Sequence, residues 1–425
     1  MDSYTQADAP PVAEPAPEGR RLLVPPMPAS IFWGWAGPLL VTVIGAVLRF
    51  SRLGVPHSVV FDETYYVPDA YGILKHGVEI NHVKNADALL AHGSTHILAV
   101  THGEYVVHPP LGKMMIAVGE WALGLTPSGW RFSAALAGTL AILMTARIAR
   151  RMTRSTLLGC VAGLLLALDG LELVLSRTAI LDIFVMFWVL AAFGLIVIDR
   201  DWARTRLAAA PPAGPDCAAG PRLGIRWRLV LAGVCLGLAC ACKWNGVWYI
   251  PAFGALVLAW DLGARRAAGF GDRCRGVLRS DAKWLPVWFG IVPVAVYAAS
   301  WTGWFATSYG YDRNGAALNG GHPTSTLVAW LQYSKSMLSY GLGLSVHQRN
   351  QSNPVSWLLL TRPVVFYTQC LPSNSCGAQG STEQEVLVIG TPLIWWASAV
   401  TLLACLVWWW VRRDWRAGSV LIAVA

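Results

Sequence analysis

Apolar runs of nearly membrane-spanning length recur along most of this chain, and short arginine-rich stretches separate them. A helix needs about 20 apolar residues to cross the hydrocarbon core of a bilayer. Hydrophobic residues make up 55% of the 425 positions and charged residues only 13%, which excludes a single soluble core. The sequence therefore predicts an all-α integral membrane protein, built as a polytopic helical bundle.

The apolar runs set the order of spans along the chain. The predicted spans cover residues 31–48, 130–147, 155–172, 178–198, 229–243, 246–261, 284–301 and 391–411, with a further one that begins near 417. Four loops between or after them are rich in arginine, namely 147–154, 199–228, 262–283 and 412–416. Because positively charged loops stay inside the cell, we expect these four to be cytoplasmic. Arg49 and Arg52, on the outer flank of the first span, run against this orientation.

One apolar segment, 111–125, breaks the alternation unless it stays on one side of the membrane. It is short for a span, carries Lys113 and Glu120, and follows the sequence His-Pro-Pro, which is typical of a helix start. We therefore expect an interfacial helix on the outer side. Residues 49–129 then form one large extracytoplasmic loop, and residues 302–390 form a second.

The rest of the composition narrows the class of protein. Residues 1–30 contain seven prolines and mixed charge, which predicts a disordered cytoplasmic tail. The formal net charge is +9, but the arginines lie in loops between spans, so membrane lipids rather than nucleic acid are the expected partners. No spacing of His or Cys resembles a zinc site and no glycine-rich phosphate loop follows a strand, so neither a metal nor a cofactor is expected.

The cysteines are distributed unevenly between the two sides of the membrane. Of the nine, only Cys370 and Cys376 fall in a predicted outer loop, where oxidation is permitted. The five residues between them leave room for a small ring. We therefore predict a disulfide between these two cysteines.

Two adjacent acids, Asp62 and Glu63, stand in the sequence FDETYY shortly after the first span. One interpretation is an ordinary pair of solvated loop acids. However, the chain has only 24 acids, and Phe61, Tyr65 and Tyr66 bracket this pair. Partial burial among these rings would raise the basicity of the carboxylates, as catalytic acids and bases require.

Cations gather in the same predicted outer regions. VVHPPLGK contains His108 and Lys113, and GWRF places Arg131 at the mouth of the second span. LDGLELVLSRTAILDIF brings Arg177 and Asp182 to the turn between two later spans. Each group also has a structural interpretation, as a helix start, a snorkelling lysine, a headgroup contact or an ion pair at a helix junction.

Lys243, in CKWNGVWY, lies at another predicted outer turn. Cations beside a lipid surface suit a phosphate carried by a lipid, since Arg offers a planar fork and Lys a point charge. A carboxylate opposite them suits a general base that takes the proton of an incoming hydroxyl. Because phosphate leaves as an anion, no general acid is needed, and direct displacement inverts the carbon that is attacked.

Seven segments, in order along the chain, resemble the bacterial branch of the protein O-mannosyltransferases: FDETYYVPDAYGILKHGVE, VVHPPLGK, GWRFSAALAG, LDGLELVLSRTAILD, DRDWAR, LACACKWNGVW and VLVIGTPLIWW. The resemblance runs from about residue 31 to the end. It implies a GT-C type bundle that moves mannose from polyprenyl phosphate mannose to Ser or Thr. The implied acceptors are secreted proteins that emerge at the outer face of the cell membrane, near the secretion channel. Family members continue with further spans, so we expect that the C-terminal spans are missing here.

The resemblance also assigns roles to individual residues. It implies that Asp62 is the catalytic acidic residue, with Glu63 beside it, and that Arg131 meets the donor phosphate. Lys113, His108 and Arg177 are further candidates for binding the donor phosphate, and Asp182 and Lys243 are weaker candidates for the site. His347 and Arg362, in the second outer loop, are weaker candidates.

Two alternative functions remain open from the sequence. One is a GT-C transferase that uses the same donor but a glycan or a lipid as acceptor. The other is a transporter of lipid-linked sugars. Transporters usually place ionisable groups at mid-bilayer in repeated halves, whereas this chain shows no evident internal repeat and its acids gather at outer span ends.

Overall fold

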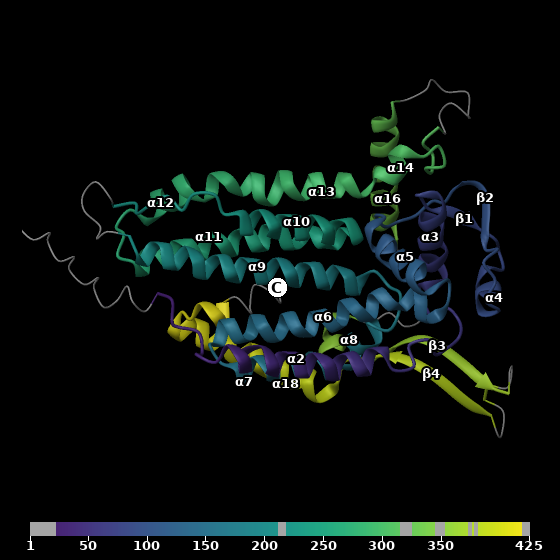
Figure 1. The fold of residues 1–425 in the computed structure, drawn as a ribbon, viewed down its shortest axis with the longest axis horizontal. Coiled ribbons are helices and arrows are strands. Elements are labelled where there is room, and N and C mark those ends of the chain that lie inside the picture. The colour runs from purple at the N-terminus through teal and green to yellow at the C-terminus, as the bar shows by residue number, and fades with distance from the viewer. Residues whose placement is uncertain are drawn as a thin grey trace, which may run out of the picture.

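A computed structural model describes residues 23–210, 218–314, 325–344, 353–372, 376–377 and 381–418. Long helices run side by side along one axis and form a bundle (Figure 1). The bundle consists of α2 (Ile31–Phe50), α6 (Pro127–Thr153), α7 (Thr156–Leu168), α9 (Asp182–Ala208), α10 (Trp227–Cys242), η2 (Trp244–Trp248), α11 (Tyr249–Ala267), α12 (Arg273–Ser280), η3 (Ala282–Trp284), the π-helical η4 (Val287–Ile291), α13 (Val292–Ser300) and α18 (Pro392–Arg412).

Six helical stretches in the described residues are long and apolar enough to cross a membrane. They are Ile31–Phe50, Pro127–Thr153, Asp182–Ala208, Trp244–Ala267, Arg273–Ser300 and Pro392–Arg412, and the shorter α7 and α10 are also apolar. This confirms the prediction of an all-α integral membrane protein with several spans. The predicted span that begins near 417 extends beyond the described residues.

Two boundaries differ from the prediction because of aspartates. The predicted span 155–172 breaks after Leu168, since Asp169 accepts a hydrogen bond from the backbone N–H of Glu172 at 3.1 Å and starts the new helix α8 (Gly170–Leu175). The predicted span 178–198 begins later, at Asp182, and extends well past its apolar run. Its added turns carry acids that pair with arginines of neighbouring segments.

One of these pairings binds four segments together at the end of the bundle that we predict to be cytoplasmic. The buried Arg226 donates to Asp199 of α9 at 2.9 Å and to Asp281, just after α12, at 3.1 Å. It also contacts Asp261 of α11. Buried charges persist only when they are paired in this way, so this network explains the helical extension of α9.

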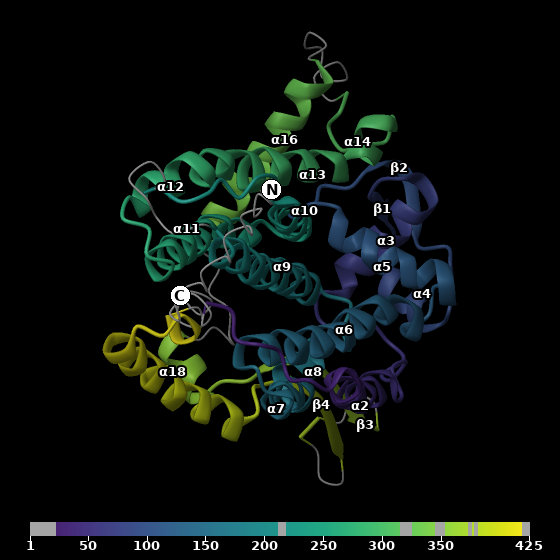
Figure 2. The same ribbon diagram turned by 60° about the vertical axis from the view of Figure 1, so that its left-hand side comes forward.

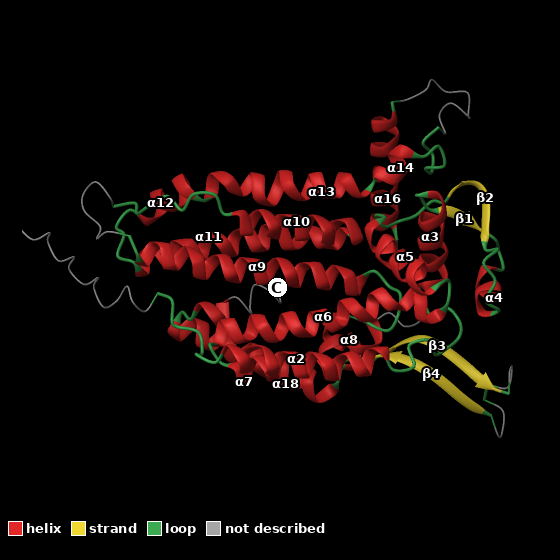
Figure 3. Cartoon of the chain, viewed as in Figure 1, coloured by secondary structure: helices red, strands yellow, loops and turns green. Residues whose placement is uncertain are grey.

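The opposite end of the bundle carries shorter elements (Figures 1 and 3). They are α3 (Glu63–His76), β1 (Ile80–His82), α4 (Ala86–Ala91), β2 (Leu98–Gly103), α5 (Leu111–Leu123), α14 (Thr302–Ala306), α16 (Thr326–Gly343), β3 (Val364–Leu371) and β4 (Thr382–Val388). The short helix α17 (Pro354–Leu359) contacts α18. The strands form two antiparallel hairpins, β1 with β2 and β3 with β4. These elements come from 49–129 and 302–390, the two segments that the sequence predicts as outer loops.

A hydrophobic core joins this end to the bundle. Buried side chains from eight elements meet in it, among them Val67, Ile116, Trp130, Phe184 and Phe366. Phe366 of β3 also stacks on Phe61, with ring centroids 4.2 Å apart and planes at 7°. The β3–β4 hairpin is therefore held directly against the residue that precedes Asp62.

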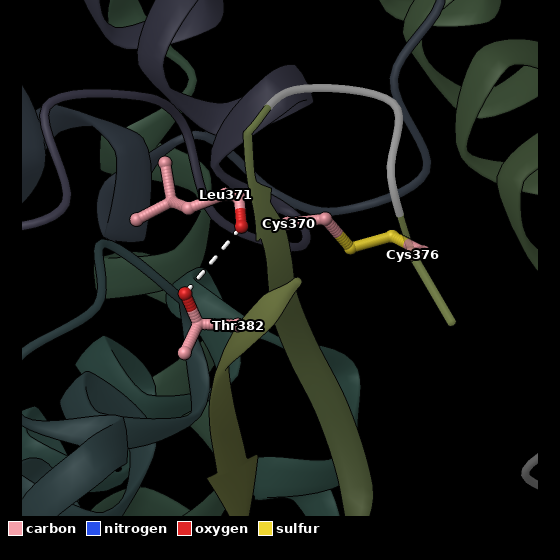
Figure 4. The surroundings of a disulfide bond; sticks show 4 residues. All are labelled: Cys370, Leu371, Cys376 and Thr382. Carbon is pink, nitrogen blue, oxygen red and sulfur yellow. Dashed lines mark hydrogen bonds between the residues drawn. A yellow bond between two sulfur atoms is a disulfide. The ribbon is translucent and has the colours of Figure 1, made fainter. Parts of the chain in front are cut away.

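A disulfide joins Cys370, near the end of β3, to Cys376 in the turn region that follows, the pairing that the sequence predicts (Figure 4). Their Cα atoms are 5.2 Å apart, within the usual range. Beside it, the Thr382 hydroxyl donates to the Leu371 carbonyl at 3.4 Å. Figure 2 shows α18 at the margin of the bundle, and none of its residues is buried.

Arg49, which conflicts with the predicted orientation, has a partner inside the protein. Its side chain is fully buried and pairs with Glu172 of α8. Its guanidinium also donates to the carbonyl of Gly45 at 3.1 Å. Because its charge is neutralised within the bundle, Arg49 does not act as a loop charge that would set the orientation.

Candidate active site

Asp62 stands immediately before α3, at the helix N-cap, yet its carboxylate does not cap the helix. Tyr66, one turn later, donates from its hydroxyl to Asp62 Oδ2 at 3.5 Å. Burial raises the pKa of Asp62, and Lys243 only partly opposes this effect. Asp62 is therefore a half-buried carboxylate that is a better base than an ordinary aspartate.

A second charged pair lies beside Asp62. Lys243, at the end of α10, donates from Nζ to both carboxylate oxygens of Asp182 at 3.0 Å. The side chains stay open to solvent, with exposed fractions of 26% for Lys243 and 44% for Asp182. Both charges act on the pKa of Asp62, since Lys243 lowers it and Asp182 raises it.

His108 completes this group, but not as a cation. Burial, together with the positive charges of Lys243 and Lys113, lowers its pKa to about 4. The imidazole is therefore neutral near pH 7, and its ring centroid lies 6.2 Å from that of Tyr66. We refer to Asp62, Tyr66, His108, Asp182 and Lys243 as the open cluster.

An apolar cavity of about 300 Å³ begins at the open cluster. Asp182 and Asn245 are among its lining residues, and the rest of its wall consists of mostly apolar side chains of α9 and α11. The cavity thus follows two bundle helices away from the charged groups.

Glu63, the neighbour of Asp62, has a different environment. Its side chain is fully buried, and it pairs with Arg131 of α6, whose Nε and Nη2 each donate to a carboxylate oxygen at 2.8 Å. It also accepts from the Val60 backbone N–H at 2.9 Å, the Ala179 backbone N–H at 2.8 Å and the Trp130 indole N–H at 3.3 Å. Because five donors of the protein already occupy this buried carboxylate, it is not available as a base.

Arg131 is equally occupied. Besides its two bonds to Glu63, it donates to the carbonyl oxygens of Leu53 at 3.3 Å, Pro56 at 2.9 Å and Ser58 at 2.8 Å. These five bonds use the five N–H groups of a guanidinium. The contact of Arg131 with the donor phosphate stays a prediction, and in this arrangement each of its N–H groups already has a protein acceptor.

Lys113 belongs to a buried group of its own. Its ammonium lies 2.5 Å from Glu79 and 3.5 Å from Asp69, and it donates to the backbone carbonyl of His108 at 3.3 Å. Burial lowers the pKa of Lys113, but the two carboxylates more than offset this effect and the pKa is raised. The lysine stays charged with all three N–H groups in use, which also argues against its predicted contact with phosphate.

The remaining predicted residues lie elsewhere. Arg177 donates to the carbonyls of Leu48, Arg49 and Ser51 at 2.6, 2.9 and 2.8 Å and so caps the C-terminus of α2. Arg362 is exposed, just before β3. His347 falls outside the described residues.

The structure thus brings together four of the predicted residues, namely Asp62, His108, Asp182 and Lys243. It adds Tyr66 and Asn245, which sequence reasoning did not single out for the site. Tyr66 could have been found from its spacing, because residues four apart on a helix share a face. Asn245 follows Lys243 by two residues in a short 3₁₀ helix, and no sequence pattern marks it.

Comparison with known proteins gives matches along the chain. A family model described as dolichyl-phosphate-mannose-protein mannosyltransferase matches residues 124–299. A polyprenol-phosphate-mannose–protein mannosyltransferase of Mycobacterium tuberculosis is 38% identical over 97% of this chain and 78% of its own length. A protein with the same name from Mycolicibacterium smegmatis is 36% identical over 99% of this chain and 80% of its own length. Another, from Corynebacterium glutamicum, is 32% identical over 92% of this chain and 76% of its own length.

Proposed function

The chain belongs to the protein mannosyltransferase family, and from that premise we propose how its open cluster transfers mannose. The donor is polyprenyl phosphate mannose, and the acceptors are Ser and Thr hydroxyls of proteins. We place the reaction at the outer face of the cell membrane, on secreted proteins near the secretion channel. The multiple apolar helices support a multi-pass membrane enzyme.

Asp62 acts as the general base. It takes the proton of the acceptor hydroxyl while the oxygen attacks the anomeric carbon of mannose, and the bond from that carbon to the phosphate oxygen breaks. Direct displacement from the opposite face inverts the anomeric configuration. The observation that carries this assignment is the contrast within one dipeptide, because Asp62 is half-exposed beside a lysine whereas Glu63 is buried and fully bonded.

Lys243 is the cation for the departing phosphate, in place of Arg131. Its ammonium is the charged donor of the open cluster, and its partner Asp182 is partly exposed. A lipid phosphate can therefore approach it and share it with Asp182. Stabilising charge that develops on a leaving group is usually a large part of catalysis, and this role needs no bound cofactor.

The other two members of the cluster orient the substrates. His108 is neutral at physiological pH, so one ring nitrogen can donate a hydrogen bond to a sugar hydroxyl and the other can accept one. Tyr66 holds the Asp62 carboxylate from one side. The apolar cavity along α9 and α11 suits the first isoprene units of the donor, since it begins at Asp182 and is lined mainly by apolar side chains.

An assay with purified enzyme tests the function. Polyprenyl phosphate mannose is supplied with a Ser/Thr peptide and, in parallel, with a saccharide acceptor. We expect transfer to the peptide, and we expect Asp62→Asn to reduce it by about 10²- to 10⁴-fold. Asp87→Asn is the matched control, because this exposed acid of α4 bonds only the Thr64 hydroxyl among the contacts seen, at 2.7–2.8 Å.

Three outcomes contradict the proposal. Normal turnover of Asp62→Asn would show that Asp62 is not the base. Transfer to the saccharide alone would show that the acceptor is not a protein. Net movement of the donor lipid without transfer of mannose would indicate a transporter. The location is tested separately by labelling single cysteines from outside the cell. We expect labelling at positions 58–66 and none at 200–225.

A further inference from the structure

The buried Glu63 links the segment that carries Asp62 to the segment that carries the Asp182–Lys243 pair. It follows Asp62 directly in the chain, and it accepts a hydrogen bond from the backbone of Ala179 at 2.8 Å. Ala179 lies three residues before Asp182, which in turn holds Lys243. A single carboxylate thus ties the segment that carries the base to the segment that carries the phosphate cation.

Arg131 braces the same carboxylate from the side of α6. Its other bonds, to the carbonyls of Leu53, Pro56 and Ser58, run along the segment that leads from α2 to Asp62. Both side chains are buried, with exposed fractions of 0% for Glu63 and 1% for Arg131. Every contact of the pair is therefore internal, and neither side chain reaches the substrates.

We propose that Glu63 and Arg131 are positioning residues that set the distance between Asp62 and the Asp182–Lys243 pair. The inference rests on the proposed function of those groups. The pair matters because the base must meet the acceptor hydroxyl while the lysine meets the phosphate of the same donor. A misplacement of about 1 Å between reacting groups can reduce a rate by about 10²-fold.

The two side chains suit this role through shape as well as charge. The guanidinium is a rigid fork that makes two parallel bonds to one carboxylate and still serves three carbonyls. An ammonium offers three N–H groups from a single point, so it cannot satisfy the same five acceptors. Arg131→Lys keeps the charge and loses the geometry, which makes it the informative change.

A double-mutant cycle of Arg131→Lys with Asp62→Asn tests the inference. We expect Arg131→Lys alone to lower kcat by about 10²-fold without raising the donor KM. In the double variant the loss should stay close to that of Asp62→Asn alone, because the position of the base no longer matters once the base is removed. Arg177→Lys is the matched control, since this arginine also braces backbone carbonyls but has no link to Glu63 among its described bonds.

If the double variant of Arg131 and Asp62 loses activity by the product of the two single losses, the inference is overturned. Such a product is the result that we expect for the control cycle with Arg177→Lys. A raised donor KM for Arg131→Lys with unchanged kcat would also overturn it, because that result indicates direct phosphate binding. If Arg131→Lys does not fold, the isosteric Glu63→Gln enters the same cycle. Activity of Asp62→Asn by itself tests the proposed function and is read independently of the cycle.

Discussion

Two groups of charges lie at the same end of this molecule, and they differ in how completely their hydrogen bonds are satisfied. In the buried groups, Glu63 with Arg131 and Lys113 with two acids, the donors are matched by protein acceptors. In the open cluster, Asp62 and Lys243 are partly exposed and keep capacity for a ligand. From this difference we infer that the cations of this surface are better candidates for catalysis where their N–H groups are not all used by the protein.

The largest expected effect is a loss of stability, which should occur when Lys113 is replaced but not when Lys243 is replaced. Lys113→Met leaves the buried acids Asp69 and Glu79 without their cation, and breaking a buried pair usually costs about 3–5 kcal/mol. We expect a matching loss in the free energy of unfolding, measured by thermal or denaturant unfolding in detergent. Lys75→Met, at an exposed position of α3, is the control and should change little. Full stability of Lys113→Met together with lost activity would place Lys113 in the open cluster instead.

The second effect is a loss of activity with little loss of stability, the reverse of the result expected for Lys113. Lys243→Met removes the phosphate cation, so we expect kcat/KM to fall by about 10²- to 10³-fold. Because its pair with Asp182 is partly exposed, stability should change by about 1 kcal/mol at most. Parallel measurements of turnover and unfolding check this, and a large loss of stability with normal turnover would erase the distinction between the two lysines.

A third effect concerns pH. The base must be ionised, and burial raises the pKa of Asp62 above that of an ordinary aspartate. Activity should therefore fall on the acid side at a higher pH than a solvated aspartate would give. Since Lys243 lowers this pKa, residual activity of Lys243→Met should decline at a still higher pH. His108, with a pKa of about 4, should add no limb near pH 6.5, and a limb there that His108→Gln removes would contradict its neutral state.

The smallest effect comes from an ion pair whose burial is intermediate between that of the buried groups and that of the open cluster. His82 Nδ1 and Glu104 Oε2 lie 3.0 Å apart, with exposed side-chain fractions of 24% and 21%, and the hydrogen bond that His82 donates to Glu104 raises the pKa of His82. A raised folded pKa gives stability that is fully present below about pH 6.5 and is lost as pH rises through the folded value. We expect less than about 1 kcal/mol, seen as a slightly lower Tm at pH 8 than at pH 6 that His82→Gln abolishes.

The sequence predicts the helices well because run length and composition decide whether a segment can cross a bilayer. It also singles out Asp62 as a candidate, since an acid among aromatic residues beyond a span is unusual. The residue pattern by itself does not distinguish Asp62 from Glu63, because adjacent residues at a helix start point in different directions and only tertiary packing buries one of them. The same holds for Arg131, whose five partners come from distant segments that no local pattern reveals.

The short helix α7 has a consequence for the membrane itself. Its 13 residues reach about 20 Å, whereas the hydrocarbon core is about 30 Å thick. Asp169 closes it abruptly and also binds the start of α18, through the Thr391 backbone at 3.1 Å and the Trp395 indole at 2.9 Å. Since Leu157, Leu164 and Leu168 of α7 are exposed, we expect the bilayer beside this helix to thin to match its length. Lipid headgroups would then lie nearer the midplane there, so the activity should depend on acyl chain length.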